Sequence, residues 1–388
     1  MKFIYPSVLL LVSLAPDICS ALEIRDYSPT RHDRFTADPR AFNPDAWIDA
    51  KAYAAVGWSM TEPKQQVVLV SPQHFLLPTH WDLKRGELVS FMAPNGGIWS
   101  STIESTTPIR QQGRKTGLSL GRFLEPLPYS SQIRPLPYLR LPSENDYLGM
   151  SLQVFGADDR VGAATLAGFA DLKSGPALSR VCRFDYPVNA GGGDDCRIEA
   201  GDTGGATLAW LNDKPVLVGT HSTVQSDDAG AVNWNYDVFV PRYAPLIDAL
   251  MKADGWRMIP SDVIPADLRM DVAITPQPLR RTQPATLTTT ISNPTPREDG
   301  NVEVTFNFFS DSPPDSISAD GWLVQQTAAA KWTMRRATMA ASASTTITAH
   351  WNAVPEIPFF GFAVTIDSDA TVGFGVPWVY LTEAPVVE

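Results

Sequence analysis

One stretch, residues 199–222, constrains the fold of this chain more than any other. It reads EAGDTGGATLAWLNDKPVLVGTHS, a glycine-rich turn followed by a strand, a short polar turn and a second strand. The glycines of Gly-Asp-Thr-Gly-Gly allow backbone conformations that other residues rarely adopt, so the turn can be tight. The stretch therefore predicts a β-rich domain with a specially shaped turn between its strands.

Length and composition agree with a turn-rich β protein. A chain of 388 residues predicts two folded units plus a targeting segment. Only 19% of the residues are charged, whereas Pro (33) and Gly (26) are plentiful, which favours β structure with many turns over helical bundles or disorder. The net charge of -11 argues against a nucleic-acid partner, because no basic patch is available to displace counterions.

The first 21 residues have the pattern of a signal peptide. Lys2 precedes an apolar run, and the small residues before Leu22 predict cleavage there. The run is too short for a membrane span and is interrupted by Pro6. A lipoprotein attached through Cys19 is the alternative, but the residues before Cys19 are not the small ones that lipid attachment requires. We expect a secreted protein, periplasmic or extracellular.

Export would leave Cys182 and Cys196 as the only thiols of the mature chain, in an oxidising compartment. We predict a disulfide between them, which would close a loop containing the glycine-rich residues 189–193 just before the turn. Such a crosslink stabilises by about 3 kcal/mol. The alternative is two unpaired cysteines.

A candidate general base lies in residues 67–81, VVLVSPQHFLLPTHW. The pattern predicts a strand, a Ser-Pro turn and a second strand that ends at His80. A histidine held rigidly at such a corner can take a proton from a nucleophile. We interpret His80 as the base and His74 as a structural neighbour.

Together these segments resemble the trypsin- and chymotrypsin-like serine peptidases. The Gly-Asp-Thr-Gly-Gly turn matches that family's nucleophile turn, and Pro-Thr-His-Trp matches its Ala-Ala-His-Cys segment. The resemblance spans residues 54–256 and implies a double β-barrel with a C-terminal helix. It also implies that His80 is the base, that Thr203 occupies the nucleophile position, and that the Gly201 and Thr203 amides form the oxyanion hole.

Two departures from the family pattern put the activity in question. Thr203 stands where the family has serine, and its β-methyl group restricts the side chain. Gly117 stands where the family has the aspartate that orients the histidine, unless Asp82 or Glu125 substitutes for it. We therefore expect a degenerate triad and a pseudoenzyme with weak or lost activity. The alternative is an active endopeptidase that uses Thr203 and His80.

The resemblance also suggests a substrate preference. His221, followed by Ser222, matches the Gly-x-His of glutamyl endopeptidases, and Arg197 lies six residues before Thr203 at the family's pocket-floor position. This implies a pocket for acidic side chains of a peptide or protein. The alternative is a buried histidine that is hydrogen-bonded within its strand. Leu22 to Ala55 contains no Arg-Ile-Val-Gly-Gly, so we do not expect a freed amine to pair with Asp202, which braces the turn.

The remaining sequence divides the chain and indicates no cofactor. Residues 22–260 are interpreted as the peptidase-like domain, whose end has helical periodicity over 243–251. From residue 268 to 388 strict alternation predicts short strands that resemble an immunoglobulin-like β-sandwich. The fold class is therefore all-β. The paired aspartates at 158–159, 194–195 and 227–228 are most simply solvated turns rather than metal ligands. The sequence leaves the oligomeric state open.

Overall fold

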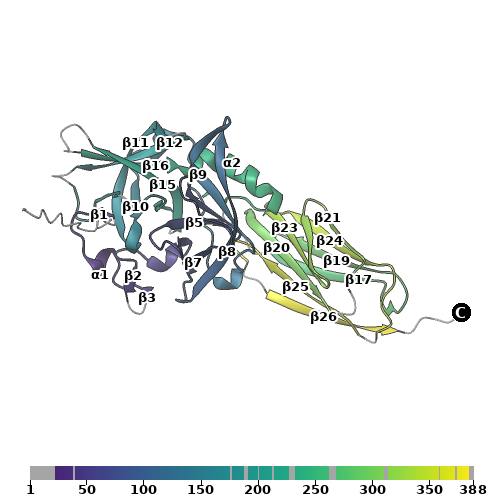
Figure 1. The fold of residues 1–388 in the computed structure, drawn as a ribbon. Coiled ribbons are helices and arrows are strands. Elements are labelled where there is room, and N and C mark those ends of the chain that lie inside the picture. Colours follow the sequence, from purple (N-terminus) through teal and green to yellow (C-terminus); the bar gives the residue numbers. More distant parts are fainter. Residues whose placement is uncertain are drawn as a thin grey trace, which may run out of the picture.

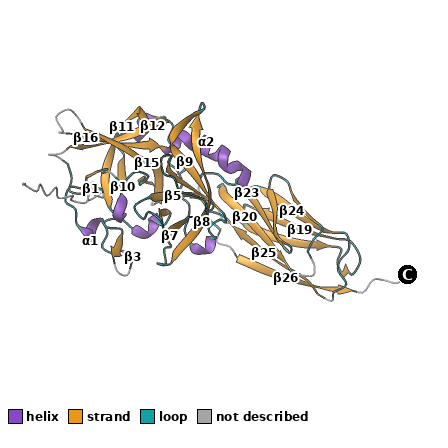
Figure 2. Ribbon diagram, in the orientation of Figure 1, coloured by secondary structure: helices purple, strands orange, loops and turns teal. Residues whose placement is uncertain are grey.

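The structure is a computed structural model that describes most of the chain after the predicted leader. The described ranges are 22–37, 40–174, 177–187, 191–199, 201–211, 214–226, 232–261, 268–309, 313–357, 359–371 and 374–383. Residues 1–21, the aspartate pair at 227–228 and most of the linker lie outside them. The predicted all-β class is confirmed, because strands form both barrels and both large sheets (Figures 1 and 2).

The first barrel is closed and six-stranded. In chain order its strands are β4 (Val56–Ser59), β5 (Gln66–Ser71), β6 (His74–Pro78), β7 (Leu88–Met92), β8 (Ile98–Gln111) and β9 (Arg114–Phe123). They are hydrogen-bonded in the order β4-β5-β6-β9-β8-β7. All residues of β5 and β6 are buried, as expected for apolar runs inside a closed barrel. The turn after β6 carries His80.

The second barrel is also closed and six-stranded. Its strands are β10 (Ser151–Phe155), β11 (Val161–Ser174), β12 (Ala177–Pro187), β14 (Ala206–Leu211), β15 (Lys214–Ser226) and β16 (Val232–Phe239), in the order β10-β11-β12-β16-β15-β14. Helix α2 (Val240–Met251) follows directly and confirms the predicted C-terminal helix. One face of α2 is buried, including Tyr243, Ile247 and Met251. Its residues join strands of both barrels in a shared hydrophobic core.

The N-terminal arm packs against both barrels. It contains β1 (Glu23–Ile24), α1 (Pro29–His32), β2 (Phe35–Ala37), β3 (Arg40–Phe42) and a 3-10 turn over Ala50–Tyr53. Strand β1 pairs with β13 (Cys196–Arg197), which lies just before the glycine-rich turn. The arm is therefore fixed to the segment that carries the candidate site. Further 3-10 turns are Tyr129–Ser131, Glu144–Tyr147, Ala157–Asp159 and Lys252–Asp254.

Two more sheets form the C-terminal part. The four-stranded sheet contains β17 (Arg269–Thr275), β19 (Ala285–Ser292), β24 (Ser344–Trp351) and β21 (Ser316–Ala319). The six-stranded sheet contains β18 (Leu279–Arg280), β26 (Phe374–Glu383), β25 (Phe359–Asp367), β20 (Asp299–Phe308), β23 (Lys331–Met339) and β22 (Leu323–Ala328). Buried residues from both sheets make one hydrophobic cluster, so the sheets are packed face to face.

The barrels and the sandwich are in contact. Figure 1 shows the sandwich beside α2 and the end of the first barrel. The Tyr129 hydroxyl donates to the Asn301 carbonyl at 2.9 Å, and the Arg257 amide donates to Asn301 Oδ1 at 3.2 Å. The guanidinium of Arg335 lies 5.2 Å from the centre of the Trp256 ring. Specific polar and cation–π contacts therefore join the two parts.

Candidate functional site

The glycine-rich turn has the backbone conformation that its sequence predicts. Gly201 has φ of 106° and Gly204 has φ of 88°, values that side chains rarely tolerate. The Gly204 amide donates to the His221 carbonyl at 3.0 Å, and the His221 amide donates to the Gly205 carbonyl at 2.9 Å. These two bonds fix the turn to strand β15.

The two amides assigned to the oxyanion hole are unpaired within the described part of the chain. Among those residues, no backbone or side-chain acceptor takes a hydrogen bond from the amide of Gly201 or Thr203. Unpaired amides on a fixed turn are the kind of donors that bind a negative oxygen. Their role as an oxyanion hole stays a prediction.

Asp202 is a buried brace for this turn. Its carboxylate accepts hydrogen bonds from the amides of Leu22 (3.2 Å), Ala157 (2.6 Å) and Glu199 (2.7 Å). Burial raises the pKa of Asp202, and the amide donors act against that shift. Leu22 is itself fully buried beside it. The sequence did not predict this contact, although its pattern placed the leader cleavage at Leu22.

His80 has no supporting partner among the described residues. It lies exposed in the turn after β6, and its nearest aromatic neighbour is Trp81 at 6.3 Å between ring centres. Although the side chain is exposed, neighbouring atoms exclude part of the water around its ring, which lowers the pKa of His80. No charged group contributes to this shift. Across the described ranges, neither Thr203 nor any carboxylate forms a hydrogen bond with the His80 ring. A general base of this type needs an acid on its second nitrogen.

The space beside Gly117 is filled by the second barrel. The Gly117 amide donates to Ser179 Oγ at 2.8 Å, and its carbonyl accepts from the Thr79 amide at 2.9 Å. A Cβ atom added to residue 117 would lie 2.8 Å from Val238 Cγ2 and 3.1 Å from Ser179 Oγ. An aspartate at this position would therefore meet a stiff β-branched side chain.

The two acids considered as substitutes lie elsewhere. The Asp82 side chain is 90% exposed, and its nearest cation is Lys84 at 3.9 Å. Glu125 lines a cavity between the first barrel and the sandwich. Neither one supports His80 in this structure.

The turn and the His80 segment are nevertheless neighbours. A Cβ atom on Gly204 would lie 2.6 Å from Trp81 Cη2 and 2.7 Å from Pro78 Cδ. Only glycine allows this approach, because any side chain at 204 would collide with both rings. The structure thus brings the segments of His80 and Thr203 together across the two barrels. Thr203 itself is partly buried.

His221 is not exposed to a substrate, which corrects its assignment to an acid-binding pocket. It is 1% exposed, its Nδ1 is 2.8 Å from Asp237 Oδ1, and its Nε2 is 2.9 Å from the Phe155 carbonyl. Burial lowers the pKa of His221, but the Asp237 carboxylate, together with Asp202 and the Phe155 carbonyl, raises it, and the net shift is upward. Both ring nitrogens are used, as the alternative of a buried structural histidine predicted.

The other two residues assigned to substrate binding also have structural surroundings. Arg197 forms ion pairs with Glu23, at 2.5 Å, and with Glu199, so its charge is already balanced. Ser222 is partly buried at an irregularity in the pairing of β15 with β16. A free positive charge for an acidic side chain is therefore not found at Arg197.

The predicted disulfide is wrong for this structure, because Cys182 and Cys196 are both free thiols. Cys182 lies opposite Phe169 of β11, whereas Cys196 packs against Gly162 of the same strand. These β11 positions are separated by about 20 Å of extended strand. A disulfide requires Cα atoms within about 7 Å. Burial raises the pKa of both thiols.

Sequence reasoning missed the partners of His74. Its Nδ1 lies 2.9 Å from Ser71 Oγ, and its Nε2 lies 3.1 Å from Asp254 Oδ2. The order resembles a catalytic set, but Ser71 is fully buried and so is closed to a substrate. We interpret the set as a link between β5, β6 and the 3-10 turn after α2.

Comparisons with known proteins add little to this geometry. No protein-family model matches the chain, and no curated protein matches it. Among solved structures, the chain is similar to the secreted serine protease VesC from Vibrio cholerae, with 11% sequence identity and a TM-score of 0.33. The match covers 86% of this chain and 69% of that one. Function is therefore inferred from the turn and from His80.

Two further observations concern metals and membranes. Within the described ranges, no group of three His, Cys, Asp or Glu residues is placed to hold a metal ion. No helix in that part of the chain is both long and apolar enough to cross a membrane.

Proposed function

We propose that this protein is a secreted homologue of the trypsin-like serine peptidases that binds a peptide or protein ligand and has lost most or all hydrolytic activity. The observation that carries the proposal is the space beside Gly117, which Val238 and Ser179 occupy. No carboxylate can stand there without repacking the second barrel. In serine proteases with a complete triad, loss of that acid lowers turnover by about 10⁴.

Thr203 adds a second obstacle. Its β-methyl group restricts χ1 and takes up space beside the base. His80, without an acid on its second nitrogen, has no group to fix its tautomer or stabilise its charged form. The two departures act on the same proton transfer, so we expect their effects to be strongly coupled rather than independent.

A weak hydrolase is the second candidate, and the turn favours it. Gly201 and Gly204 keep the required positive φ, the Gly201 and Thr203 amides are unpaired among the described residues, and Asp202 holds the loop in place. Oxyanion stabilisation and binding alone leave a residual rate of about 10³ to 10⁴ over water in a serine protease without its triad.

An activity assay on the mature protein separates the two candidates. Wild type, Thr203→Ser and Thr203→Ala are compared on peptide ester and peptide amide substrates. We expect wild type and Thr203→Ala to show the same background rate. If wild type hydrolyses substrate and Thr203→Ala does not, the binding-protein proposal fails and Thr203 is the nucleophile.

Peptide binding is the positive test of the same proposal. A peptide library is panned against the mature protein, and retained peptides are retested against His80→Ala, which removes an exposed ring from the segment that packs against the turn. We expect weaker binding in that variant and no preference for Glu or Asp, because Arg197 is paired and His221 is buried. Undiminished binding would place the ligand elsewhere.

We also propose that removal of a leader before Leu22 matures the turn. The Leu22 nitrogen already lies 3.2 Å from Asp202 Oδ1 in a buried site. Cleavage there would turn a neutral amide into an ammonium group next to a buried carboxylate. This route needs no internal Arg-Ile-Val-Gly-Gly, whose absence was the reason for not expecting it.

Chains that begin at Leu22 and at Ala21 test this maturation step. We expect the one-residue extension to lower the free energy of unfolding by about 1 to 3 kcal/mol, because it removes the charge and crowds a buried site. Equal stability of the two chains would contradict the proposal.

We also propose a division into two domains. The first is a peptidase-like unit (22–260), and the second is an immunoglobulin-like sandwich (268–388).

A further inference from the structure

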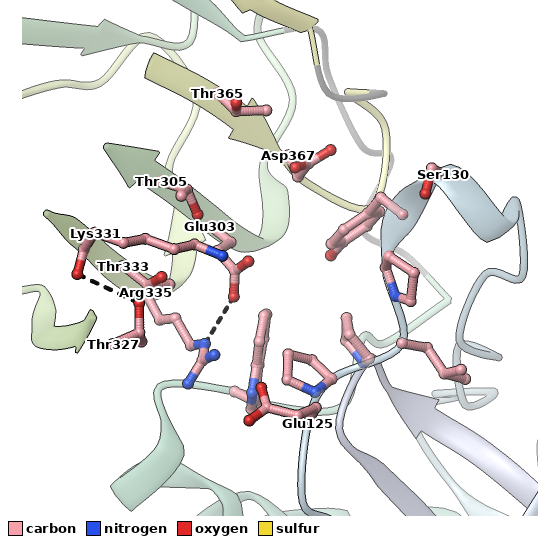
Figure 3. A pocket seen from close by; sticks show the side chains of 16 residues that line it. Glu125, Ser130, Glu303, Thr305, Thr327, Lys331, Thr333, Arg335, Thr365 and Asp367 are labelled. Carbon is pink, nitrogen blue, oxygen red and sulfur yellow. Dashed lines mark hydrogen bonds and ion pairs between the residues drawn. The ribbon is translucent and has the colours of Figure 1, made fainter. Parts of the chain in front are cut away.

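A cavity of about 410 Å³ lies between the first barrel and the sandwich (Figure 3). Its volume is in the range of small-molecule sites. Both parts of the chain contribute to its lining. Residues 125–130, which follow the first barrel, lie on one side, and strands β20, β22, β23 and β25 of the sandwich lie on the other. The candidate peptidase site uses none of these residues.

One wall is a polar sheet face with two in-register rows. Thr305 on β20 pairs with Thr333 on β23 and with Thr365 on β25. Two residues away on β20, Glu303 pairs with Arg335 and with Asp367 in the same way. Because side chains alternate between faces along a strand, both rows face the same side. Figure 3 shows them on strands that border the cavity.

The other side of the cavity is lined by residues 125–130, with Pro72 and Trp256. Pro128 is exposed and Pro126 is half-buried, whereas Pro72, Leu127 and Trp256 are buried. The Trp256 Nε1 donates to Gln73 Oε1 at 3.0 Å, so its polar atom is already used. The two proline rings are therefore the apolar surface that this side presents, and the exposed Glu125 and Ser130 lie on the same segment.

The charges of the cavity do not select a charged ligand. Arg335 Nε donates to Glu303 Oε2 at 2.8 Å, so these two charges are balanced within the wall. Lys331 brings a positive charge, and Glu125 and Asp367 bring negative ones, so both signs are present. A purely apolar ligand is equally disfavoured, because it would strip water from hydroxyl and carboxylate groups without replacing their hydrogen bonds.

We propose that this cavity binds a neutral saccharide of one to three sugar units. Sugar hydroxyls both donate and accept, which matches the threonine hydroxyls of the sheet face. The C–H faces of a sugar ring match the rings of Pro126 and Pro128 on the other side. The proposal goes beyond the proposed function and does not depend on it.

Isothermal titration calorimetry on the chain from Leu22 to Glu388 tests the saccharide site. The probes are maltotriose, cellotriose and N,N′-diacetylchitobiose, each up to about 10 mM, a range that detects millimolar affinity. We expect at least one probe to bind. Thr305→Val and Thr365→Val should each weaken that probe by a factor of about 3 to 10, because each removes one hydrogen bond.

Two control variants separate a lost hydroxyl from a disturbed fold. Thr305→Ser keeps the hydroxyl and should bind within about twofold of wild type. Thr346→Val makes the same change at an exposed position of β24, on the other sheet, and should leave binding unchanged. Absence of binding by all three saccharides overturns the proposal. So does binding that Thr305→Val and Thr365→Val leave unchanged.

Discussion

The two halves of the candidate site differ in how they are held. On the side of the turn, the Asp202 carboxylate accepts hydrogen bonds from three backbone amides. The backbone of His221 is hydrogen-bonded to Gly204 and Gly205. On the side of the base, His80 has no polar partner among the described residues, and Val238 fills the space beside Gly117. The turn is therefore held by several hydrogen bonds, whereas no polar group of the described residues holds the His80 ring.

This difference indicates which contacts of the candidate site contribute to the stability of the fold. The turn is tied to the N-terminal arm, to the second barrel and to strand β15, so its conformation contributes to stability regardless of catalysis. An orienting carboxylate contributes mainly to proton transfer. The glycine at 117 instead lets Val238 and Ser179 pack closely at the junction of the barrels.

Removal of the Asp202 carboxylate is expected to have the largest effect. In Asp202→Ala, the buried amides of Leu22, Ala157 and Glu199 lose their acceptor. We expect the free energy of unfolding to fall by about 3 to 5 kcal/mol. Urea denaturation measures it, with Asp82→Ala, an exposed acid next to His80, as the control. A loss below about 1 kcal/mol would show that the turn does not depend on this brace.

Restoration of the acid at residue 117 is expected to have the next largest effect. Gly117→Asp forces a side chain against Val238 Cγ2 and Ser179 Oγ and should destabilise the fold by about 2 kcal/mol. Val238→Ala makes room, so the double variant should be more stable than the sum of the single changes predicts, by about 1 kcal/mol. Additive effects would mean that Val238 does not close this space.

The same double variant also tests whether the candidate site can regain activity. Combined with Thr203→Ser, it offers His80 an acid and offers the turn a serine, so we expect measurable peptide ester hydrolysis. Thr203→Ser alone should not gain activity, because His80 still lacks its partner. Activity in Thr203→Ser alone would show that His80 can act as the base without an orienting acid.

Local patterns in the sequence predicted the turn, and long-range contacts decided the rest. The glycines of 201–205 fix the backbone within a few residues, and alternation predicted the strands of the barrels and the sandwich. The contact of Leu22 with Asp202 joins residues 180 apart, and that of Gly117 with Ser179 joins residues 62 apart. No local spacing rule contains such information. The disulfide was mispredicted for the same reason.

The role of His221 was also decided by a distant partner. Its match to a short motif predicted a pocket residue, but Asp237 on the neighbouring strand β16 buries and pairs it. A motif records the spacing of residue types along the chain. It does not record which face of the sheet each side chain occupies once a bulge shifts the register between β15 and β16.

Asp237→Asn tests whether the charge of Asp237 stabilises His221, to whose backbone the turn is hydrogen-bonded. The Asp237 carboxylate raises the pKa of His221 against the effect of burial, so its stabilisation is present below the unfolded pKa and lost as pH rises through the folded value. With asparagine, only Asp202 and the Phe155 carbonyl oppose the effect of burial, so the upward shift of the His221 pKa becomes smaller. We expect the variant to be less stable than wild type by about 1 kcal/mol in mild acid, with a smaller difference in mild alkali. Denaturation at several pH values measures this, and parallel pH profiles would contradict it.

Loss of the ion pair between Arg31 of the N-terminal arm and Asp194, in the loop before the turn, is expected to have the smallest effect. Arg31 Nη2 lies 2.7 Å from Asp194 Oδ2, and hydrogen bonds from Arg31, then His32, lower the pKa of Asp194 to about 2. A lowered carboxyl pKa gives stability that is present above the unfolded pKa of about 4 and lost as pH falls towards 2. Because the Arg31 side chain is 53% exposed, solvent screens the pair. Arg31→Ala should therefore cost about 0.5 kcal/mol near neutral pH and move acid unfolding to a higher pH. An acid transition at the same pH in both proteins would mean that the His32 contact and the backbone bonds of the arm hold this loop without Arg31.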